Sequence, residues 1–471
     1  MIRKYFSMLT MNYERTLLYM LQQVEYDIPQ YIKWLHRVKD FRTVAKRGQM
    51  VPTPKAHALF LALALFVLVY AGLAVYLAIS AGLVMGYLLA ILVILILPVL
   101  APYVLVVPLV VGRYVVQKPL ELNTISMAKK YVKGHAGFKI AIAGSYGKTT
   151  AKEVLRTVLS GGRKVAATPG NINQPLGLAK FVMSLKGDED VVIFELGECR
   201  PGDIAEMCEF VQPEAGFITG INEAHLESFG SLENIIGDIF SLRDFLEGRP
   251  LYLNGDNDIL RREDEKSTTL YSRDGTENNI VSGVKIGPFD TVFSLGRFKV
   301  HSGLLGWHNI GIISAAVELA GQMGLTDEEI RAGLRDLRPF EHRMQPYELN
   351  GAVIIDDTYN GNLDGVKVGL ELMGQLKANR KLYVTPGLVE QGDKTEANHQ
   401  EIGRLLARQV DEVVLIRNSV TGFITDSLVK HGFTGKLTII DDPLNFYENL
   451  DKFVAAGDLV LMQNDWTDNY S

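Results

Sequence analysis

One interval of the chain is far more hydrophobic than the rest. Between Lys55 and Arg113 there is no Asp, Glu, Lys or Arg, and most residues are Leu, Val, Ala or Ile. A bilayer crossing takes about 20 apolar residues, so the interval is long enough for two crossing helices. We place them near residues 59–79 and 83–104, and a third short element stays open because prolines disturb the second end. Soluble cores do not need uncharged runs of this length, which argues against a buried soluble hairpin.

The flanks of this interval predict its orientation. The residues around it are basic: Arg42, Lys46, Arg47 and Lys55 before it, and Arg113 and Lys118 after it. Positively charged flanks stay in the cytoplasm, so both ends of the hairpin are predicted to be cytoplasmic. The interval begins too far from the N-terminus for a cleavable signal peptide. We therefore predict a multi-pass protein of the cytoplasmic (inner) membrane, with its later domains in the cytoplasm.

Residues 1–56 mix apolar, aromatic and basic positions. The apolar ones include Leu17, Leu21, Tyr31 and Trp34, and they alternate with Arg15, Lys33, Arg37 and Lys39. Such an amphipathic segment favours one or two helices on the membrane surface. Helices that pack on each other before the membrane are an equally good interpretation.

After about residue 137 the pattern changes to alternating strand-like and helix-like segments. Such alternation predicts α/β domains with parallel sheets. The first domain, 137–338, has strand candidates at 139–143, 191–195, 215–221 and 250–253. The second, 339–471, has them at 352–356, 382–385, 412–416 and 459–462. A linker at 114–136 joins the hairpin (57–113) to the first domain, and the polar stretch 261–288 predicts β-hairpins and loops.

Composition and charge exclude only a few classes of function. The net charge of -6 is mild, so no nucleic-acid partner is expected. The two cysteines, Cys199 and Cys208, suggest reduced thiols rather than a disulfide framework or a metal array.

The strongest chemical motif follows the strand candidate at 139–143. It comprises Gly144, Ser145, Tyr146, Gly147, Lys148, Thr149 and Thr150. Glycines in such a turn let backbone N–H groups close on phosphate oxygens, and the following helix adds a favourable dipole. Lys148 would contribute a positive charge, and the Thr149 hydroxyl would bind Mg²⁺. Ile142 replaces the first glycine of the strict pattern, but strand and helix flank the loop as a phosphate-binding loop requires. An ordinary glycine turn is the alternative.

Two residues at strand ends could join this loop. Glu195 ends the apolar strand 191–195, and His225 follows the strand candidate 215–221. Carboxyl ends of parallel strands meet at one edge of a sheet, where a carboxylate can hold Mg²⁺. Each residue alone is weak evidence, since such a Glu is often a solvated cap and a lone His is often structural.

In their order along the chain, several short motifs resemble the Mur ligases, most closely the type that adds D-alanyl-D-alanine. They lie at residues 144–150, 168–173, 195–197, 224–231, 254–256, 306–309, 342–344 and 356–360. The resemblance implies an ATP-binding middle domain with a phosphate loop and a parallel sheet, followed by a Rossmann-like C-terminal domain. The fold class is thus α/β, preceded by an α-helical transmembrane hairpin.

The resemblance also implies roles for individual residues. Lys148 and Thr149 would bind phosphate and Mg²⁺, and Glu195 and His225 would hold metal. Asn309 would contact the adenine of ATP, Arg343 would reach the γ-phosphate, and Asp357 would belong to the nucleotide site. A carboxylate would attack the γ-phosphate to give an acyl phosphate and ADP, and an amine would then displace phosphate.

The chain also departs from the family pattern. Ile239 stands where the family has a lysine that is commonly carbamylated to bridge metals, with Asp238 adjacent, and Ile312 replaces a second asparagine. The Tyr-Asn-Ala-Asn-Pro motif appears as residues 359–363 with Gly361, and Lys-Gly-Ser appears as Gln463, Asn464 and Asp465. The last two changes concern the incoming amine.

The membrane hairpin stands where the family has a domain that reads the UDP end of its precursor. We therefore expect a membrane-anchored, ATP- and Mg²⁺-dependent ligase that joins an amino acid or dipeptide to a carboxylate on a cell-envelope precursor. Partner enzymes of cell-wall synthesis are also possible. The alternatives are a poly-amino-acid (polyglutamate-type) synthetase and a non-catalytic nucleotide-binding scaffold in a cell-wall complex.

Overall fold

The structure is a computed structural model of the 471-residue chain. It describes residues 2–10, 12–24, 26–45, 50–80, 83–223, 226–262, 268–359, 361–388 and 391–464. The chain forms two compact units, Met1–Thr124 and Ile125–Ser471.

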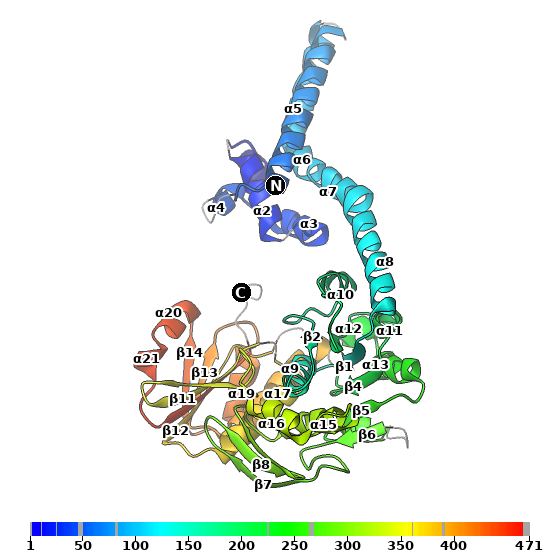
Figure 1. The fold of residues 1–471 in the computed structure, drawn as a ribbon. Coiled ribbons are helices and arrows are strands. Elements are labelled where there is room, and N and C mark those ends of the chain that lie inside the picture. Colours follow the sequence, from blue (N-terminus) through cyan, green and yellow to red (C-terminus); the bar gives the residue numbers. More distant parts are fainter. Residues whose placement is uncertain are drawn as a thin grey trace. The chain divides into compact units, whose positions relative to one another are not determined.

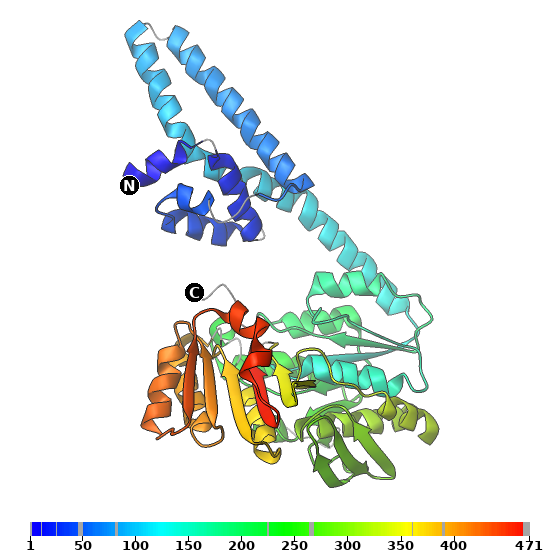
Figure 2. The same cartoon turned by 90° about the vertical axis from the view of Figure 1, so that its left-hand side faces the viewer.

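The first unit contains the predicted hairpin as two long antiparallel helices (Figure 2). α5 (Pro54–Ser80) and α6 (Leu83–Val104) include both predicted spans, so the prediction of two apolar helices is confirmed. By length and composition, two helical runs could cross a membrane, Pro54–Ser80 and Val84–Gly134. Only 17% and 22% of their most apolar windows are buried in the protein. Core helices of a soluble domain are mostly buried, so these exposed runs do not fit that alternative.

The N-terminal segment folds into four short helices that pack together. They are α1 (Ile2–Met8), α2 (Tyr13–Gln23), α3 (Ile28–Arg37) and α4 (Phe41–Ala45). Leu17, Leu18 and Leu21 of α2 share a core with Tyr31 and with the base of the hairpin. Of the two interpretations of residues 1–56, the structure therefore shows helices packed on each other.

The segment expected to be a linker is helical. α7 (Val106–Val111), the π-helical turn η1 (Gly112–Gln117) and α8 (Lys118–Gly134) follow one another without a loop. The end of α8 lies in the second unit, where Ala128 and Val132 are buried in the core of the middle domain. The start of the middle domain is thus a helix as well as a strand.

The middle domain is built on a six-stranded parallel sheet with the order β2-β3-β1-β4-β5-β6 (Figure 1). Its strands are β1 (Phe138–Ala143), β2 (Val165–Ala167), β3 (Val191–Glu195), β4 (Ala215–Ile218), β5 (Leu251–Asn254) and β6 (Thr268–Tyr271). The four predicted strands are present, although β4 ends three residues early. β6 lies within the stretch expected to form hairpins and instead adds a parallel strand to the edge of the sheet.

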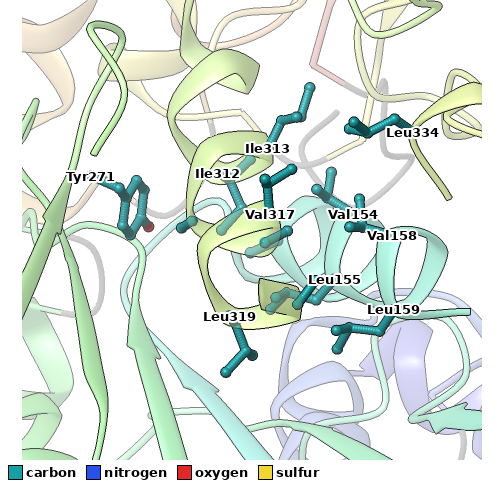
Figure 3. Packing of buried hydrophobic residues seen from close by; sticks show 14 of the residues in the cluster. Val154, Leu155, Val158, Leu159, Tyr271, Ile312, Ile313, Val317, Leu319 and Leu334 are labelled. Atoms are coloured by element: carbon teal, nitrogen blue, oxygen red, sulfur yellow. The ribbon is translucent and has the colours of Figure 1, made fainter. Parts of the chain in front are cut away.

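Helices cover both faces of this sheet. α9 (Lys148–Leu159), α15 (His308–Gln322) and α16 (Asp327–Arg335) pack on one face, and Figure 3 shows the apolar contact of α9 with α15. The other face carries α10 (Pro175–Val182), α11 (Asp203–Val211) and α13 (Leu232–Leu246). Two short helices, α12 (Leu226–Phe229) and α14 (Asp258–Arg262), follow strands β4 and β5. Alternate residues of β1 point to the two cores, as a strand buried on both faces requires.

A small antiparallel sheet closes the domain on the α15 side. Its strands are β7 (Val281–Ile286), β8 (Thr291–Leu295) and β9 (Phe298–Ser302). Phe293 and Phe298 join the core formed with α9 and α15. The expected hairpins therefore exist, but they extend beyond residue 288.

The C-terminal domain is a second α/β sandwich, with strand order β10-β11-β15-β12-β13-β14. β10 (Gln345–Leu349) is antiparallel to β11 (Ala352–Asp357), and β12 (Arg380–Thr385), β13 (Glu412–Ile416), β14 (Lys436–Ile440) and β15 (Asp458–Gln463) are parallel to β11. α17 (Leu363–Gln375), α18 (Thr395–Leu406) and α19 (Thr421–Lys430) cover one face, and α20 (Pro443–Glu448) and α21 (Leu450–Phe453) cover the other. A single 3₁₀ turn, η2 (Gly392–Lys394), precedes α18.

Candidate active site

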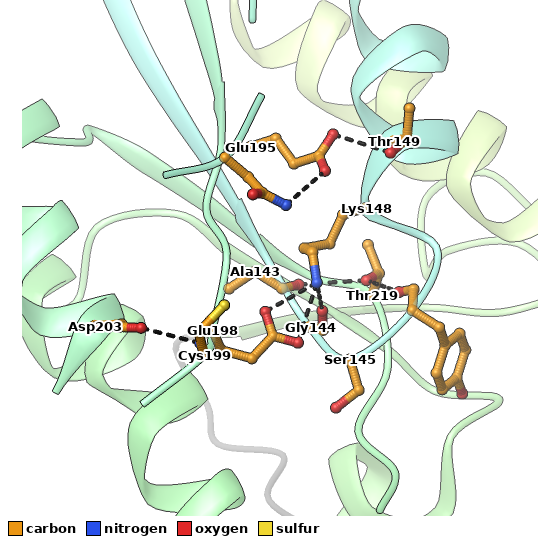
Figure 4. Close-up of polar contacts among 12 residues, drawn as sticks. Ala143, Gly144, Ser145, Lys148, Thr149, Glu195, Glu198, Cys199, Asp203 and Thr219 are labelled. Carbon is orange, nitrogen blue, oxygen red and sulfur yellow. Dashed lines mark hydrogen bonds and ion pairs between the residues drawn. The ribbon is translucent and has the colours of Figure 1, made fainter. Parts of the chain in front are cut away.

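The phosphate-loop motif lies between β1 and α9, at the carboxyl edge of the middle sheet (Figure 4). Gly147 caps α9 in a left-handed conformation with φ 78°, and Gly144 has φ 135°. A Cβ at residue 144 would lie 2.5 Å from the Thr219 hydroxyl, so only glycine fits. No side chain caps the first turn of α9 among the described residues. Its N–H groups therefore point to a site suited to an anion.

Lys148 is held by a buried carboxylate that sequence reasoning missed. Its Nζ lies 2.9 Å and 3.1 Å from the two carboxylate oxygens of Glu198, and it also donates to the Gly144 carbonyl. The Glu198 side chain is only 1% exposed, and that of Lys148 is 13% exposed. Glu198 follows the strand end by three residues, and that proximity was the one available signal in the sequence. A bound phosphate would have to compete with this ion pair for Lys148.

A second buried network surrounds Glu195, at the end of β3. Its Oε2 accepts hydrogen bonds from the Thr149 hydroxyl at 3.0 Å and from Lys152 Nζ at 3.1 Å. Its Oε1 accepts one from Asn173 Nδ2 at 3.3 Å. The Lys152 side chain is completely buried and also donates to the Gly170 carbonyl. The structure therefore brings Thr149 and Glu195 together as predicted. Lys152 also belongs to this network, but it was not predicted because it lies among the apolar residues of a helix.

Thr149 and Glu195 have the hard oxygen donors that Mg²⁺ prefers. His225 lies outside the described residues. No group of three or more His, Cys, Asp or Glu that could hold a metal is found in the described part of the chain. A hydroxyl and a carboxylate side by side are donors that fit Mg²⁺.

The position of the carbamylated lysine is structural in this chain. Ile239 is fully buried in the core beneath the sheet. The adjacent Asp238 accepts a hydrogen bond from the Gly202 N–H at 2.6 Å, while its other oxygen is buried without a hydrogen-bond partner. Burial and the nearby charges of Asp203 and Glu198 raise the pKa of Asp238.

The remaining loop residues fix the loop to the neighbouring strand end. The Ser145 N–H donates to the Gly220 carbonyl at 2.8 Å, and the Tyr146 hydroxyl accepts a hydrogen bond from Asn257 at 3.1 Å. The Tyr146 ring packs on Gly220, where a Cβ would come within 2.2 Å of it. Thr150 lies half-buried in the first turn of α9. These contacts hold the loop in shape without using its N–H groups at the start of α9.

Asn309 lies at the start of α15 and is 4% exposed. Its Nδ2 donates to the Leu305 carbonyl at 2.7 Å and lies 3.0 Å from His308 Nε2. Burial lowers the pKa of His308 to about 4, so the ring is neutral and this nitrogen can accept. Both amide protons of Asn309 thus have partners within the protein.

Arg343 comes from the C-terminal domain, which contacts the middle domain through polar side chains. Asn222 donates to Asp364 at 3.1 Å, and Arg273 pairs with Glu371 at 3.0 Å. Arg343 stacks on the Tyr359 ring, with its guanidinium carbon 4.1 Å from the ring centre. Burial lowers its pKa, and the charge of Glu195 opposes that effect. The charges of Asp357 and Tyr359 oppose it more strongly.

Asp357 ends β11, near Arg343. It accepts hydrogen bonds from Gln463 Nε2 at 2.7 Å and from the Met344 N–H at 3.2 Å. Burial nevertheless raises its pKa to about 6. The residues on either side of Arg343 both have left-handed backbones, with φ 57° at His342 and 45° at Met344. Non-glycine residues adopt this conformation at a cost.

Two departures from the family pattern fit each other at the end of β15. Asn464 has φ 70°, as a glycine at this position would allow, and its side chain is 5% exposed. Its Oδ1 lies 1.1 Å from the place where a Cβ of residue 361 would be. The asparagine therefore occupies the space that the alanine of the family motif would need, and Gly361 makes room for it. Asn360 and Asp465 lie outside the described residues.

The fold and these contacts define a class of protein with two α/β domains, a phosphate-loop motif at the sheet edge of the first and an arginine stacked on a tyrosine ring in the second. The family model of the Mur ligase middle domain matches residues 142–320, and that of the Mur ligase, glutamate ligase domain matches residues 342–463. Together they cover more than half of the chain, which belongs to the Mur ligase family and is therefore an ATP-dependent ligase. Residues before 142 lie outside both matches.

Similar proteins point to one branch of this family. The UDP-N-acetylmuramoyl-tripeptide–D-alanyl-D-alanine ligase of Bacillus subtilis (strain 168) is 26% identical over 72% of this chain and 75% of its own length. The enzyme of the same name from Escherichia coli (strain K12) is 29% identical over 64% and 69%.

Solved structures agree with this assignment. The MurF ligase from Thermotoga maritima, in complex with ADP, is 26% identical, with a TM-score of 0.64 over 73% of this chain and 80% of that one. MurF from Acinetobacter baumannii, at 24% identity and a TM-score of 0.64 over 73% and 77%, shares the fold.

Proposed function

We propose that this chain is a membrane-anchored, MurF-like ligase that forms an amide between a carboxylate of a peptidoglycan-type precursor and an amino acid or dipeptide. ATP is the energy source, and an acyl phosphate is the intermediate. The observation that carries the proposal is the cluster of Lys148, Thr149 and Glu195 at one sheet edge, with Arg343 in electrostatic reach. The names of the curated relatives supply the substrate class.

The chemistry proceeds in two steps that balance. A carboxylate oxygen of the precursor attacks the γ-phosphorus of ATP, the bond to the β-γ bridging oxygen breaks, and ADP leaves. The amine then attacks the carbonyl carbon of the acyl phosphate, inorganic phosphate leaves with the C–O electrons, and the amine loses a proton. Both steps concentrate negative charge near the phosphate loop.

Each residue of the site has a role in stabilising that charge. Lys148 breaks its ion pair with Glu198 and binds a phosphate oxygen instead. The N–H groups at the start of α9 bind the other phosphates. Thr149 and Glu195 would hold Mg²⁺, while Lys152 and Asn173 orient the Glu195 carboxylate. When bound, the ion supplies further neutralisation of the phosphates. Arg343 approaches from the C-terminal domain, so full stabilisation requires both domains.

The hairpin suggests a membrane-associated precursor. Anchoring near the bilayer raises the effective concentration of a lipid-linked substrate without any new contact. The second possibility is that the hairpin only keeps the enzyme beside its partner enzymes while a soluble, UDP-linked precursor is used. A non-catalytic scaffold is a second candidate function, favoured by the engaged amide of Asn309 and by Ile239 at the metal-bridging position.

The test uses the full-length chain in nanodiscs and follows ADP release. UDP-linked and lipid-linked muramoyl peptides are each offered with D-alanyl-D-alanine or single amino acids. We expect ADP release only when precursor and amine are both present. If residues 120–471 alone turned over a UDP-linked precursor faster than a lipid-linked one, the proposal of a lipid-linked precursor would be contradicted. Nucleotide binding without turnover on any pair would favour the scaffold.

The matched variants in this test are Lys148→Ala and Lys180→Ala. Loss of Lys148 should lower turnover at least about 100-fold, because it carries transition-state charge rather than core packing. Lys180 is exposed near the end of α10, so its replacement should leave turnover unchanged. Normal phosphate release by Lys148→Ala would overturn the phosphate-loop assignment.

A further inference from the structure

The base of the hairpin has exposed apolar groups outside α5 and α6. Phe6 of α1 is 62% exposed, and Leu9, just after α1, is 54% exposed. Both belong to a bundle that otherwise buries its apolar residues against the hairpin. On the other side of the hairpin base, Val107 and Val110 of α7 are 60% and 37% exposed.

Hydrogen bonds show how far along the hairpin α1 reaches. The Tyr5 hydroxyl donates to the Leu95 carbonyl at 2.7 Å, and the Tyr13 hydroxyl donates to the Pro98 carbonyl at 2.9 Å. From the start of α6 to Leu95 is about 18 Å at the helical rise of 1.5 Å per residue. A bilayer core is about 30 Å thick. A hairpin that crosses the core therefore brings the Tyr5 contact about 10 Å below the near surface of the hydrocarbon.

The contact at Pro98 belongs in that environment. Pro102 has no N–H, so the Pro98 carbonyl lacks its helical partner. An unsatisfied carbonyl is costly inside a bilayer, where no water replaces the partner. The Tyr13 hydroxyl satisfies it. The bundle therefore supplies the missing partner of one α6 carbonyl at a depth where water cannot.

The charge of the N-terminal unit also agrees with a position at the membrane surface. Residues 1–124 contain twelve Lys or Arg and five Asp or Glu, although the whole chain is acidic. Lys33, Arg37 and Lys39 are exposed, and none of the three forms an ion pair within the described residues. A basic surface beside exposed apolar side chains matches a leaflet that contains anionic phospholipid.

We propose that α1 is an interfacial helix that inserts Phe6 and Leu9 into the cytoplasmic leaflet of an anionic phospholipid bilayer. The proposal rests on the membrane anchoring of the proposed function, but it concerns a different surface. It makes the N-terminal bundle part of the membrane-bound face of the protein. The bundle then fixes the depth of the hairpin as well as covering its base.

The test places single nitroxide labels on the full-length chain in nanodiscs of phosphatidylcholine and phosphatidylglycerol. The labelled sites are Phe6→Cys and Leu9→Cys, with Val69→Cys on α5 as the bilayer control and Lys180→Cys, exposed on α10, as the water control. Cys199 is replaced by Ser. Cys208 is kept because it is buried, and burial raises the pKa of its thiol to about 12.

Collisions with oxygen and with a water-soluble nickel chelate report the depth of each label. We expect labels at residues 6 and 9 to favour oxygen, at a depth shallower than residue 69, and the label at residue 180 to favour nickel. Oxygen preference at residue 69 together with nickel preference at residues 6 and 9 would overturn the proposal while leaving the anchor intact. Nickel preference at all four positions would overturn the anchor as well.

Discussion

Two sheet edges in this molecule look alike in topology and differ in chemistry. Both the middle and the C-terminal domain gather functional side chains where parallel strands end. The middle edge is strongly charged and balanced, with Lys148 and Lys152 against Glu195 and Glu198. At the C-terminal edge, the Asp357 carboxylate is bonded by the Gln463 amide instead of by a lysine.

The difference follows from what each edge has to stabilise. Phosphate transfer develops charge, so buried lysines and carboxylates that can exchange partners are useful there. Gln463 instead uses its amide to join Asp357, Tyr383 and the Gly365 carbonyl. At the same edge, the Asn464 Oδ1 is buried without a hydrogen-bond partner. Substitutions at each edge can therefore test this difference separately.

The largest effect is expected at the residue that joins the two edges. Arg343→Ala should lower turnover by about 100-fold or more, because an arginine that acts on the transferring phosphate serves mainly the transition state. The dissociation constant of the nucleotide should change far less. Turnover and nucleotide affinity are measured on the same protein, with Arg335→Ala, an exposed residue at the end of α16, as the control. Equal losses in both quantities would make Arg343 an ordinary ground-state contact.

The next largest effect is expected at Gly361 and Asn464, at the C-terminal sheet edge. Gly361→Ala should destabilise the protein by about 1–3 kcal/mol, because its Cβ would overlap the Asn464 amide. The double variant Gly361→Ala with Asn464→Gly should recover most of that stability. Denaturant unfolding of the two single variants and the double variant gives the coupling energy. Additive effects would show that the two sites are independent.

A smaller effect is expected from Glu198 at the charged edge. Glu198→Gln removes the competitor for Lys148, so nucleotide should bind about tenfold more tightly, which corresponds to about 1.4 kcal/mol. Glu206→Gln, exposed on α11, is the matched control. Titration calorimetry with ADP and Mg²⁺ measures both. Weaker binding in Glu198→Gln would instead make Glu198 a ligand of the metal.

The smallest effect concerns the pH dependence of Asp357. Its pKa is raised to about 6 by burial, so between about pH 4 and 6 the folded state holds a proton that the unfolded state has lost. This group should therefore make stability fall as pH rises through that window, by at most about 1.4 kcal/mol per pH unit. Asp357→Asn should flatten that part of the stability curve. An unchanged slope would mean that Asp357 ionises with an ordinary pKa.

The residues at the sheet edge of the middle domain could be predicted from the sequence better than those at the edge of the C-terminal domain. Lys148, Thr149 and Glu195 follow strand and turn signals that are local, so their meeting could be predicted. Glu198 and Lys152 were missed because their partners lie 50 and 43 residues away. The fit of Asn464 to Gly361 could not be seen either, since each looked like a separate departure from the family pattern.

The strands and helices also differ in how well the sequence predicted them. β2 and β14 were not predicted, because one is short and the other is only partly buried at a sheet edge. The core strands β1, β3, β11 and β13 were predicted because nearly every position is apolar, as burial on both faces demands. The helical linker was missed because its exposed polar residues resemble a loop.

By itself, the sequence determined what depends on neighbouring residues: two long apolar helices, a strand-turn-helix phosphate loop, and the order of motifs that marks the family. Apolar length and glycine conformation act over a few residues, so they can be read directly. The tertiary structure decided which charges neutralise one another, which asparagine fills which gap, and how far the N-terminal bundle reaches along the hairpin. Those features depend on packing between segments that are distant in the chain, where burial and close contact set the free energy.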